Sequence, residues 1–243
     1  MKNLVVIPAF NEEHALPAVV EDLNRLPPNY DWLIVNDGST DGTRATAERL
    51  ARASHGHGHV VHLPMNCGIG VTVQTGYLFA AWKSGYEYVI QFDGDGQHDA
   101  GYVETLVDEC RRRGLDLCIG SRFVDESADG FRSTAARRAG IRLFRVLIGS
   151  LTGAVVTDPT SGFRCAGPRA WASFAHRYPD DYPEPESLFW CVRNGLRVGE
   201  VGVRMRERQG GVSSIRRLRA LYYMTKVSAS ILIDRMRARE YRG

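Results

Sequence analysis

The chain has 243 residues, of which 44% are hydrophobic and 24% are charged, and its formal net charge is +3. This length and composition are those of an ordinary globular protein with room for one α/β domain and a real core. The five cysteines are scattered without a C-x-x-C pair, which argues against a disulfide framework or a zinc site and favours buried thiols in a reducing cytoplasm. The first apolar run, residues 4–7, is too short for a signal peptide, and no run approaches the roughly 20 residues that span a bilayer.

Strands and helices are expected to alternate along the chain. The expected strands are residues 2–7, 31–36, 60–63, 88–92, 116–119 and 196–205. The expected helices are residues 12–26, 41–54, 70–84, 99–113, 183–194 and 215–239. This alternation predicts a mostly parallel, doubly wound sheet with right-handed crossovers and helices on its faces. A Gly/Ser hinge at residues 208–214 divides a domain at 1–212 from a C-terminal helix at 213–243.

One acidic turn stands out, at the end of the strand expected at 88–92. Every second side chain of an extended segment points the same way, so Asp93, Asp95 and Gln97 are expected to converge. Two carboxylates and an amide oxygen suit Mg²⁺ or Mn²⁺ with positions left for phosphate oxygens. The alternative is a solvated acidic turn, which is what most short D-x-D sequences are. His98 is expected to be a turn residue that shapes the site.

The other strands also end in small or acidic clusters, and ligands bind at this edge of open α/β sheets. A nucleotide is the expected occupant, with its base near Asp37 and its phosphates near Asp93 and Asp95. The G-x-G-x-x-G and G-x-x-x-x-G-K-[ST] fingerprints of dinucleotide-binding and P-loop proteins do not occur in the sequence.

Five motifs in fixed order resemble those of the family 2 glycosyltransferases of the GT-A fold, and in particular dolichyl- or polyprenyl-phosphate mannose and glucose synthases. The motifs are PAFNE at 8–12, NDGSTDGT at 36–43, NCGIG at 66–70, DGDGQHD at 93–99 and DPTSGFR at 158–164. The resemblance implies metal-dependent, inverting transfer of a hexose from a GDP-mannose or UDP-glucose type donor to undecaprenyl or dolichyl phosphate. A phosphate acceptor needs no protein base, because its second pKa lies near 6.

The resemblance also implies roles for particular residues. The positions implied to bind the nucleoside are Pro8, Phe10, Glu12 and Asp37. The positions implied to act on the metal, the diphosphate or the neighbouring phosphates are Asp93, Asp95, Gln97, Arg122 and Arg164. Further substrate-binding positions are Gly68, Asp158 and Ser161, with Arg208 and Ser213 in an R-x-x-G-x-S segment that folds over the site. Phe10 stands where the family commonly has Tyr, so stacking remains and a hydroxyl contact is lost.

Two other functions remain open at this point. A family 2 transferase acting on a glycan or protein hydroxyl would need a general base, and the sequence assigns none. Glu184 and Glu186 are expected to be first-turn helix acids and nothing more. A non-catalytic module that binds nucleotide-sugar or recruits a membrane partner is the third alternative, although the D-x-D-x-Q sequence argues against it. No motif for nucleic acid is present.

Charge is distributed unevenly along the chain. From residue 213 onward there are eight basic and two acidic residues, whereas residues 1–212 are mildly acidic. The last helix places one broad apolar face on Leu218, Leu221, Tyr222, Thr225, Ala229, Leu232 and Met236. With the basic and apolar stretch at 131–151, this helix is expected to lie peripherally on the cytoplasmic face of a membrane. A small membrane-anchoring protein is a further expected partner, and packing of both stretches on the body is the alternative.

Overall fold

A computed structural model describes residues 1–124, 135–206 and 217–237 of the chain. The strands of its single sheet are β1 (Lys2–Ala9), β2 (Tyr30–Asn36), β3 (Gly58–His62), β4 (Tyr86–Gln91), β5 (Leu117–Ser121), β6 (Arg164–Ala166) and β7 (Val198–Gly202). The helices are α1 (Leu16–Leu23), α2 (Thr43–Ala53), α3 (Ile69–Lys83), η1 (Ala100–Tyr102), α4 (Val103–Arg113), α5 (Ala135–Thr152), α6 (Pro168–His176), α7 (Pro183–Arg193) and α8 (Arg217–Met236).

The strand order is β3-β2-β1-β4-β6-β5-β7, and every pair is parallel except the two that involve β6. The expected mostly parallel α/β sheet is therefore confirmed. The sequence missed β6 and the helix α6 that follows it. β6 has only three residues, with no alternating apolar pattern, and it is defined by pairing with β4 and β5 on its two sides.

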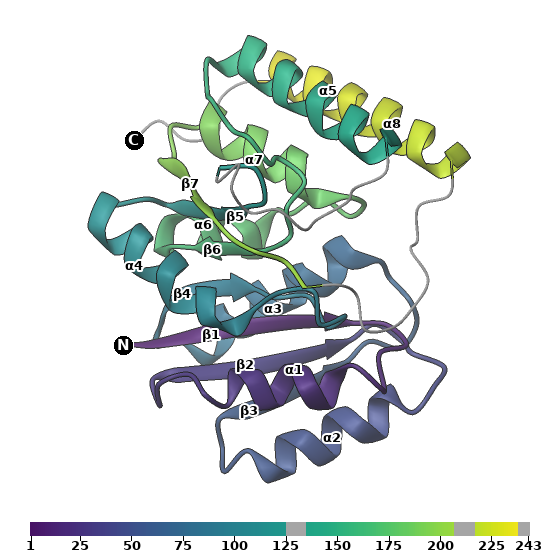
Figure 1. Ribbon diagram of the computed structural model, residues 1–243, viewed down its shortest axis with the longest axis vertical. Coiled ribbons are helices and arrows are strands. Elements are labelled where there is room, and N and C mark those ends of the chain that lie inside the picture. Colours follow the sequence, from purple (N-terminus) through teal and green to yellow (C-terminus); the bar gives the residue numbers. More distant parts are fainter. Residues whose placement is uncertain (125–134, 207–216, 238–243) are drawn as a thin grey trace.

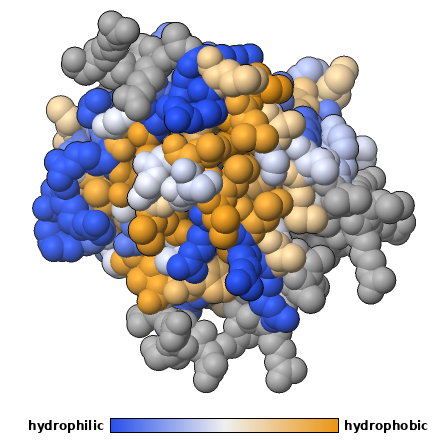
Figure 2. Space-filling view, turned by 90° about the horizontal axis from the view of Figure 1, so that it is seen from above, coloured by the Kyte–Doolittle hydropathy of each residue, from blue (hydrophilic) through white to orange (hydrophobic). Residues whose placement is uncertain are grey.

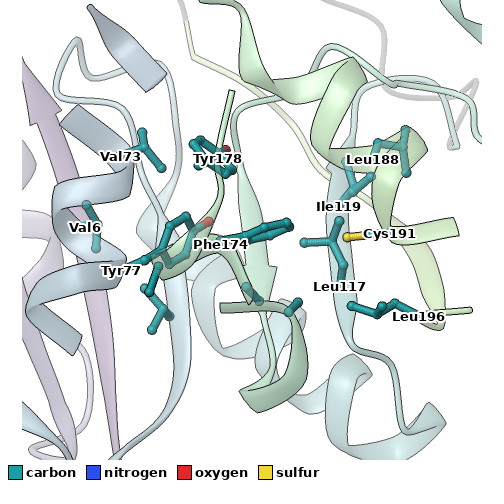
Figure 3. Packing of buried hydrophobic residues seen from close by; sticks show 14 of the residues in the cluster. Val6, Val73, Tyr77, Leu117, Ile119, Phe174, Tyr178, Leu188, Cys191 and Leu196 are labelled. Atoms are coloured by element: carbon teal, nitrogen blue, oxygen red, sulfur yellow. The ribbon is translucent and has the colours of Figure 1, made fainter. Parts of the chain in front are cut away.

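Each central strand contributes side chains to two hydrophobic layers, because successive side chains point to opposite faces of the sheet. In β1, Leu4 and Val6 belong to the layer packed by α3, α6 and α7, whereas Val5 and Ile7 belong to the layer packed by α1, α2 and α4. Figure 3 shows the first layer, where Tyr77 of α3 packs against Phe174 of α6. Both faces are thus covered, and the ends of the strands are left for a site.

Helices α5 and α8 lie side by side over the β5–β7 half of the molecule, above α7 (Figure 1). Val227 and Ile231 are the buried residues that pack α8 onto the body. The described residues of its predicted apolar face, which are Tyr222, Thr225, Ala229, Leu232 and Met236, are all exposed. A C-terminal helix is confirmed, but its apolar side chains lie on both sides, because one side packs on α5 and α7 and the other faces outward. The expected boundary at 212/213 lies outside the described residues.

Candidate active site

The acidic turn after β4 forms the centre of the candidate site. From Phe92 to Ala100 burial alternates with each residue, so Asp93, Asp95 and Gln97 are partly exposed while the residues between them are buried. The Asp95 carboxylate helps to hold the turn, since its Oδ1 accepts the Gln97 N–H at 3.0 Å. The three side chains therefore face outward together from the carboxyl end of β4.

His98 lies beneath this turn and supports it. Its ring stacks on Phe163 with centroids 4.7 Å apart and meets Phe92 edge-on. Burial lowers the pKa of His98 to about 4, so the ring is neutral at physiological pH. The Asp93 N–H donates to Nδ1 at 3.0 Å, which leaves the ring proton on Nε2, 3.5 Å from Asp93 Oδ2. His98 thus fixes both the backbone and the carboxylate of Asp93.

The PAFNE motif follows β1 and touches the acidic turn. A Cβ on Gly94 would lie 3.0 Å from the Pro8 carbonyl oxygen, so glycine permits the close approach of the two segments. Phe10 is 44% exposed, which leaves its ring available for stacking. Glu12 is nearly buried, and its N–H donates to Thr43 Oγ1 at 2.8 Å, which ties the motif to α2.

Asp37 is placed at the end of β2, where its carboxylate holds the loop that follows β3. Oδ1 accepts the Cys67 N–H at 2.7 Å, and Oδ2 accepts the Gly68 N–H at 3.0 Å. Gly68 has φ of +91°, a conformation that favours glycine. In this structure Asp37 therefore positions the NCGIG loop beside the site, in addition to any contact with a base.

Arg122 and Asp158 are brought together as a buried, bidentate ion pair. Arg122 Nε and Nη2 each lie 2.7 Å from one Asp158 oxygen, and their side chains are 2% and 0% exposed. Glu200 of β7 supports the same loop, because it accepts the N–H groups of Thr157 and Asp158 at 2.7 and 2.8 Å. The Arg122 guanidinium thus holds the 158–161 loop, where the resemblance had placed a phosphate contact.

Arg164 has a similar structural role. The residue is 1% exposed, and its guanidinium donates to the carbonyl oxygens of Ser161 at 2.7 Å and Pro159 at 2.9 Å. A third bond joins it to Ser187 of α7 at 3.0 Å. Ser161 in turn donates to the Gly120 carbonyl oxygen at 2.7 Å. Arg164 therefore ties the loop to α7 from inside the protein.

The 158–164 loop approaches the acidic turn closely at Gly162. A Cβ at this position would lie 3.0 Å from Gln91 Nε2 and 3.1 Å from Asp93 Oδ2. The loop backbone thus packs directly against the carboxylate of Asp93. The two buried arginines consequently position Asp93 through the loop that they hold.

Glu184 is the site residue that sequence reasoning missed. It lies in the first turn of α7, hydrogen-bonds with Gln91, and is close enough to Asp93 for the two carboxylates to interact. Its burial, and then the charge of Asp93, raise its pKa, although nearby Arg164 opposes this. Its neighbour Glu186 occupies the same turn but contacts Ser230 of α8 instead. No local sequence signal distinguishes the two acids, because the distinction depends on which side of α7 faces β4.

The R-x-x-G-x-S segment, with Arg208 and Ser213, lies outside the described residues. Just before this segment, the Arg206 N–H donates to the Gln97 carbonyl oxygen at 2.8 Å, and its guanidinium pairs with Asp99 at 3.1 Å and with Asp22. The chain that leaves β7 therefore reaches the rim of the acidic turn.

The chain was compared with known families and proteins. The profile of glycosyl transferase family 2 matches residues 4–171. The chain belongs to glycosyltransferase family 2. A polyprenol monophosphomannose synthase from Mycolicibacterium smegmatis is 31% identical over 218 residues, which cover 88% of this chain and 81% of that protein. An undecaprenyl-phosphate mannosyltransferase from Micrococcus luteus is 29% identical over 221 residues, covering 88% of both chains.

The fold of this glycosyltransferase is also that of solved structures. Glucosyl-3-phosphoglycerate synthase from Mycobacterium tuberculosis, crystallised with Mn²⁺, uridine diphosphate and phosphoglyceric acid, matches with a TM-score of 0.70 at 22% identity. The match covers 100% of this chain and 80% of that one. The expected GT-A fold and the expected enzyme class are thus confirmed, and the non-catalytic alternative is set aside.

The side chains at the acidic turn can be compared with the ligands that a divalent ion requires. The described residues hold no group of three His, Cys, Asp or Glu side chains arranged as metal ligands. Asp93, Asp95 and Gln97 do present oxygen atoms at the partly exposed turn, and the carboxyl group of Glu184 lies close to Asp93. These residues fit a hard cation that completes its ligands with phosphate oxygens, and they do not form a closed protein cage.

Proposed function

We propose that this glycosyltransferase transfers a hexose from a nucleotide-sugar to a polyprenyl phosphate, with inversion at the anomeric carbon. The observation that carries the proposal is the outward alternation of Asp93, Asp95 and Gln97 at the carboxyl end of β4. The acceptor class is supported by the names of the relatives from Mycolicibacterium smegmatis and Micrococcus luteus.

The donor nucleotide would lie along the strand ends from β2 to β4. Phe10 offers an exposed ring for stacking on a base, with Pro8 and Glu12 on either side of it in the motif and Glu12 tied to Thr43 of α2. Asp37 would contribute through the backbone of Cys67 and Gly68, which its carboxylate holds in place. The diphosphate would then reach the acidic turn.

Asp93, Asp95 and Gln97 would hold Mg²⁺ or Mn²⁺ at this turn. Such an ion, when bound, neutralises charge on the leaving diphosphate. The chain's own residues orient the ligands: His98 fixes Asp93 from below, and Gly162 confines it from the side. Arg122, Asp158, Ser161 and Arg164 serve the reaction by holding the loop that carries Gly162.

The acceptor phosphate is its own nucleophile. With a second pKa near 6 it is largely dianionic at neutral pH, so one of its oxygens attacks the anomeric carbon without transferring a proton to the protein. The new bond joins this oxygen to the anomeric carbon, and the bond from that carbon to the nucleoside diphosphate breaks. No general base is needed for this acceptor.

A second candidate function is transfer to a glycan or protein hydroxyl. The observation that favours it is the position of Glu184, whose carboxyl group lies beside Asp93 and hydrogen-bonds with Gln91. A hydroxyl acceptor must lose a proton as it attacks, and a carboxylate next to the donor site is suited to accept it. The two functions therefore differ in the work they assign to Glu184.

The polyprenyl acceptor would be reached at a membrane surface. The exposed arginines Arg138, Arg142 and Arg145 of α5 lie among apolar residues such as Val146, which is 62% exposed. On α8, Met236 is 79% exposed. Figure 2 shows the outer face of the α5–α8 pair, where a broad apolar area is bordered by hydrophilic side chains.

These observations support peripheral binding to the cytoplasmic leaflet, because arginines among exposed apolar groups suit anionic headgroups and the acyl chains beneath them. Within the described part of the chain, none of the helices combines the length and the apolar character required to cross a bilayer. A separate small membrane protein that anchors this face remains part of the proposal.

The test is transfer of label from UDP- and GDP-sugars to undecaprenyl phosphate in detergent, with Mg²⁺ or Mn²⁺ and with EDTA. Label in the organic phase that is lost with EDTA is the expected result. Donor hydrolysis without lipid label would reject the polyprenyl acceptor. Glu184→Gln separates the two functions: a phosphate acceptor predicts rates within about threefold of wild type, and a hydroxyl acceptor predicts a loss of about 10²–10⁴-fold.

A further inference from the structure

A cavity of about 360 Å³ lies on the side of α7 that faces away from the acidic turn. Its walls come from the end of α6, the segment 178–181, α7 and α8. Pockets for small ligands begin at about 300 Å³, so the cavity has the size of a binding site. Glu186 and Trp190 of α7 line it, whereas Glu184 faces Gln91 and Asp93.

Glu186 of α7 is one of the charged groups that line this cavity. Its carboxyl group is partly buried and hydrogen-bonds with Ser230 of α8. Burial raises its pKa to about 7, the charges of Asp234 and Asp180 add to this, and the nearby Lys226 opposes it. Lys226 itself pairs with Asp181. Among the described residues, Glu186 therefore forms no ion pair.

The two other basic side chains that line the cavity lie at its rim. Arg177 is exposed and pairs with Asp234 at 3.2 Å. Arg237 is exposed as well. The lining thus has four carboxylates and three basic groups. Among the described residues, Asp181 and Asp234 form ion pairs, whereas the partly buried Glu186 and the exposed Asp180 form none. This distribution disfavours an anion and favours a cation.

The remaining wall is aromatic and includes one buried donor without a described partner. Phe174, Phe189 and Trp190 line the cavity, with the rings of Phe174 and Trp190 6.1 Å apart. The indole N–H of Trp190 is buried and has no partner in hydrogen-bond geometry within the part of the chain that the structure describes. A buried donor of this kind is normally satisfied, so it indicates a polar group that is brought by a ligand.

We propose that this cavity binds a small organic cation, with an ammonium group at Glu186 and an apolar body against Phe174, Phe189 and Trp190. Aromatic rings attract a cation through their faces, and a charge-assisted hydrogen bond to Glu186 fixes its position. A hydrocarbon would leave Glu186 and the Trp190 indole N–H desolvated without compensation. A bare metal ion lacks a suitable ligand group, since the described residues contain no cluster of three His, Cys, Asp or Glu that holds one.

The inference goes beyond the proposed sugar transfer and does not rest on it. The cavity is separated from Asp93 by α7, and its ligand would contact α7 and α8 at once. Its test therefore measures binding to the full chain, without a donor, an acceptor or a metal ion.

The probes are benzylamine and benzyl alcohol, which have nearly the same shape and differ in charge. Each is titrated into the ¹⁵N-labelled full chain at about pH 8, where Glu186 and the amine are both charged. The readout is the indole N–H resonance of Trp190, identified among the four tryptophans by Trp190→Phe. The amine is expected to shift this resonance saturably, with an affinity at least about tenfold above that of the alcohol.

Glu186→Gln is expected to reduce the amine affinity at least about tenfold, to that of the alcohol. The matched control is Glu184→Gln, two residues earlier on the same helix, which is expected to leave the amine affinity unchanged. Equal binding of amine and alcohol to the unaltered chain would overturn the proposal without reliance on any variant. Loss of amine binding in Glu184→Gln but not in Glu186→Gln would place the amine at the acidic turn and would also overturn it.

Discussion

Charged side chains lie both at the turn after β4 and around the loop before β6. Those at the turn are partly exposed to solvent, whereas those around the loop are buried. Asp93 and Asp95 are partly exposed at the opening, whereas Asp158, Arg122 and Arg164 are almost completely buried. The buried charges hold backbone and one another, and the exposed ones face the place where a substrate would lie. Burial thus separates the residues that we propose to bind the substrate from those that hold the loop, which a motif alone does not do.

The largest expected effect on stability comes from breaking the Arg122–Asp158 pair. Arg122→Ala should reduce the free energy of unfolding by about 3–5 kcal/mol, because Asp158 is left buried without its partner. Denaturant unfolding measures this change, with Asp95→Asn as the control that keeps an acceptor for the Gln97 N–H and should stay within about 0.5 kcal/mol.

The double variant Arg122→Met, Asp158→Leu should recover most of the lost stability, because it leaves no unpaired buried charge. If Arg122→Ala proved as stable as wild type, the pair would not hold the loop and the distinction between the two regions would fail.

The next largest loss of stability is expected from a change at Arg164. Arg164→Met keeps the length of the side chain but removes the bonds to Ser161, Pro159 and Ser187, so stability should fall by about 2–4 kcal/mol. Thermal unfolding with and without UDP and Mn²⁺ measures it. A variant of unchanged stability that had lost only UDP affinity would show that Arg164 contacts the phosphates directly.

Gly162→Ala probes the contact between the two regions. The added methyl group should displace Asp93 by a few tenths of an ångström and lower the transfer rate about three- to tenfold, with less than about 1 kcal/mol of stability lost. The matched control is Gly149→Ala in α5, where a Cβ would make an ordinary 3.4 Å contact. Equal rates for the two variants would mean that the loop does not position Asp93.

The two glutamates in the first turn of α7 also differ in surroundings, because Glu184 lies near Asp93 and Glu186 lines the cavity beside α8. Burial raises the folded-state pKa of Glu186 from 4.5 to about 7, so its ionisation opposes folding increasingly as pH rises from about 4.5 to 7. Glu186→Gln should therefore be more stable than wild type above pH 7, by about 1–2 kcal/mol, and no more stable below pH 4.5. Unfolding measured across this range tests the sign, and a variant less stable at about pH 8 would contradict it.

Much of the fold could be predicted from the sequence, because β1, β2 and β4 are apolar runs that end in polar turns. The sequence of α6 also contains features typical of a helix, with Pro168 in the first turn and apolar Ala170 and Phe174 four residues apart. The sequence of β6 contains no comparable signal, since three residues carry no periodicity and their antiparallel pairing depends on distant strands. The outward direction of the apolar face of α8 likewise depends on packing against α5 and α7.

The candidate site was predictable where its residues are adjacent in sequence and less so elsewhere. The side chains of the 93–97 turn follow the period of an extended chain, so their common direction could be stated in advance. The roles of Arg122 and Arg164 could not, because a sequence does not say whether a guanidinium is buried against Asp158 or open to a phosphate. Glu184 enters the site only because α7 packs beside β4.

The most direct test of the central claim is UDP and GDP binding by calorimetry, with Mn²⁺ and with EDTA, to the wild type and to Asp95→Asn. The account predicts that the wild type binds one nucleotide at least about tenfold more tightly with Mn²⁺ than with EDTA. The variant should unfold at the wild-type temperature and lose this difference. If Asp95→Asn kept the full effect of Mn²⁺ on nucleotide affinity, the acidic turn would not be the metal and diphosphate site.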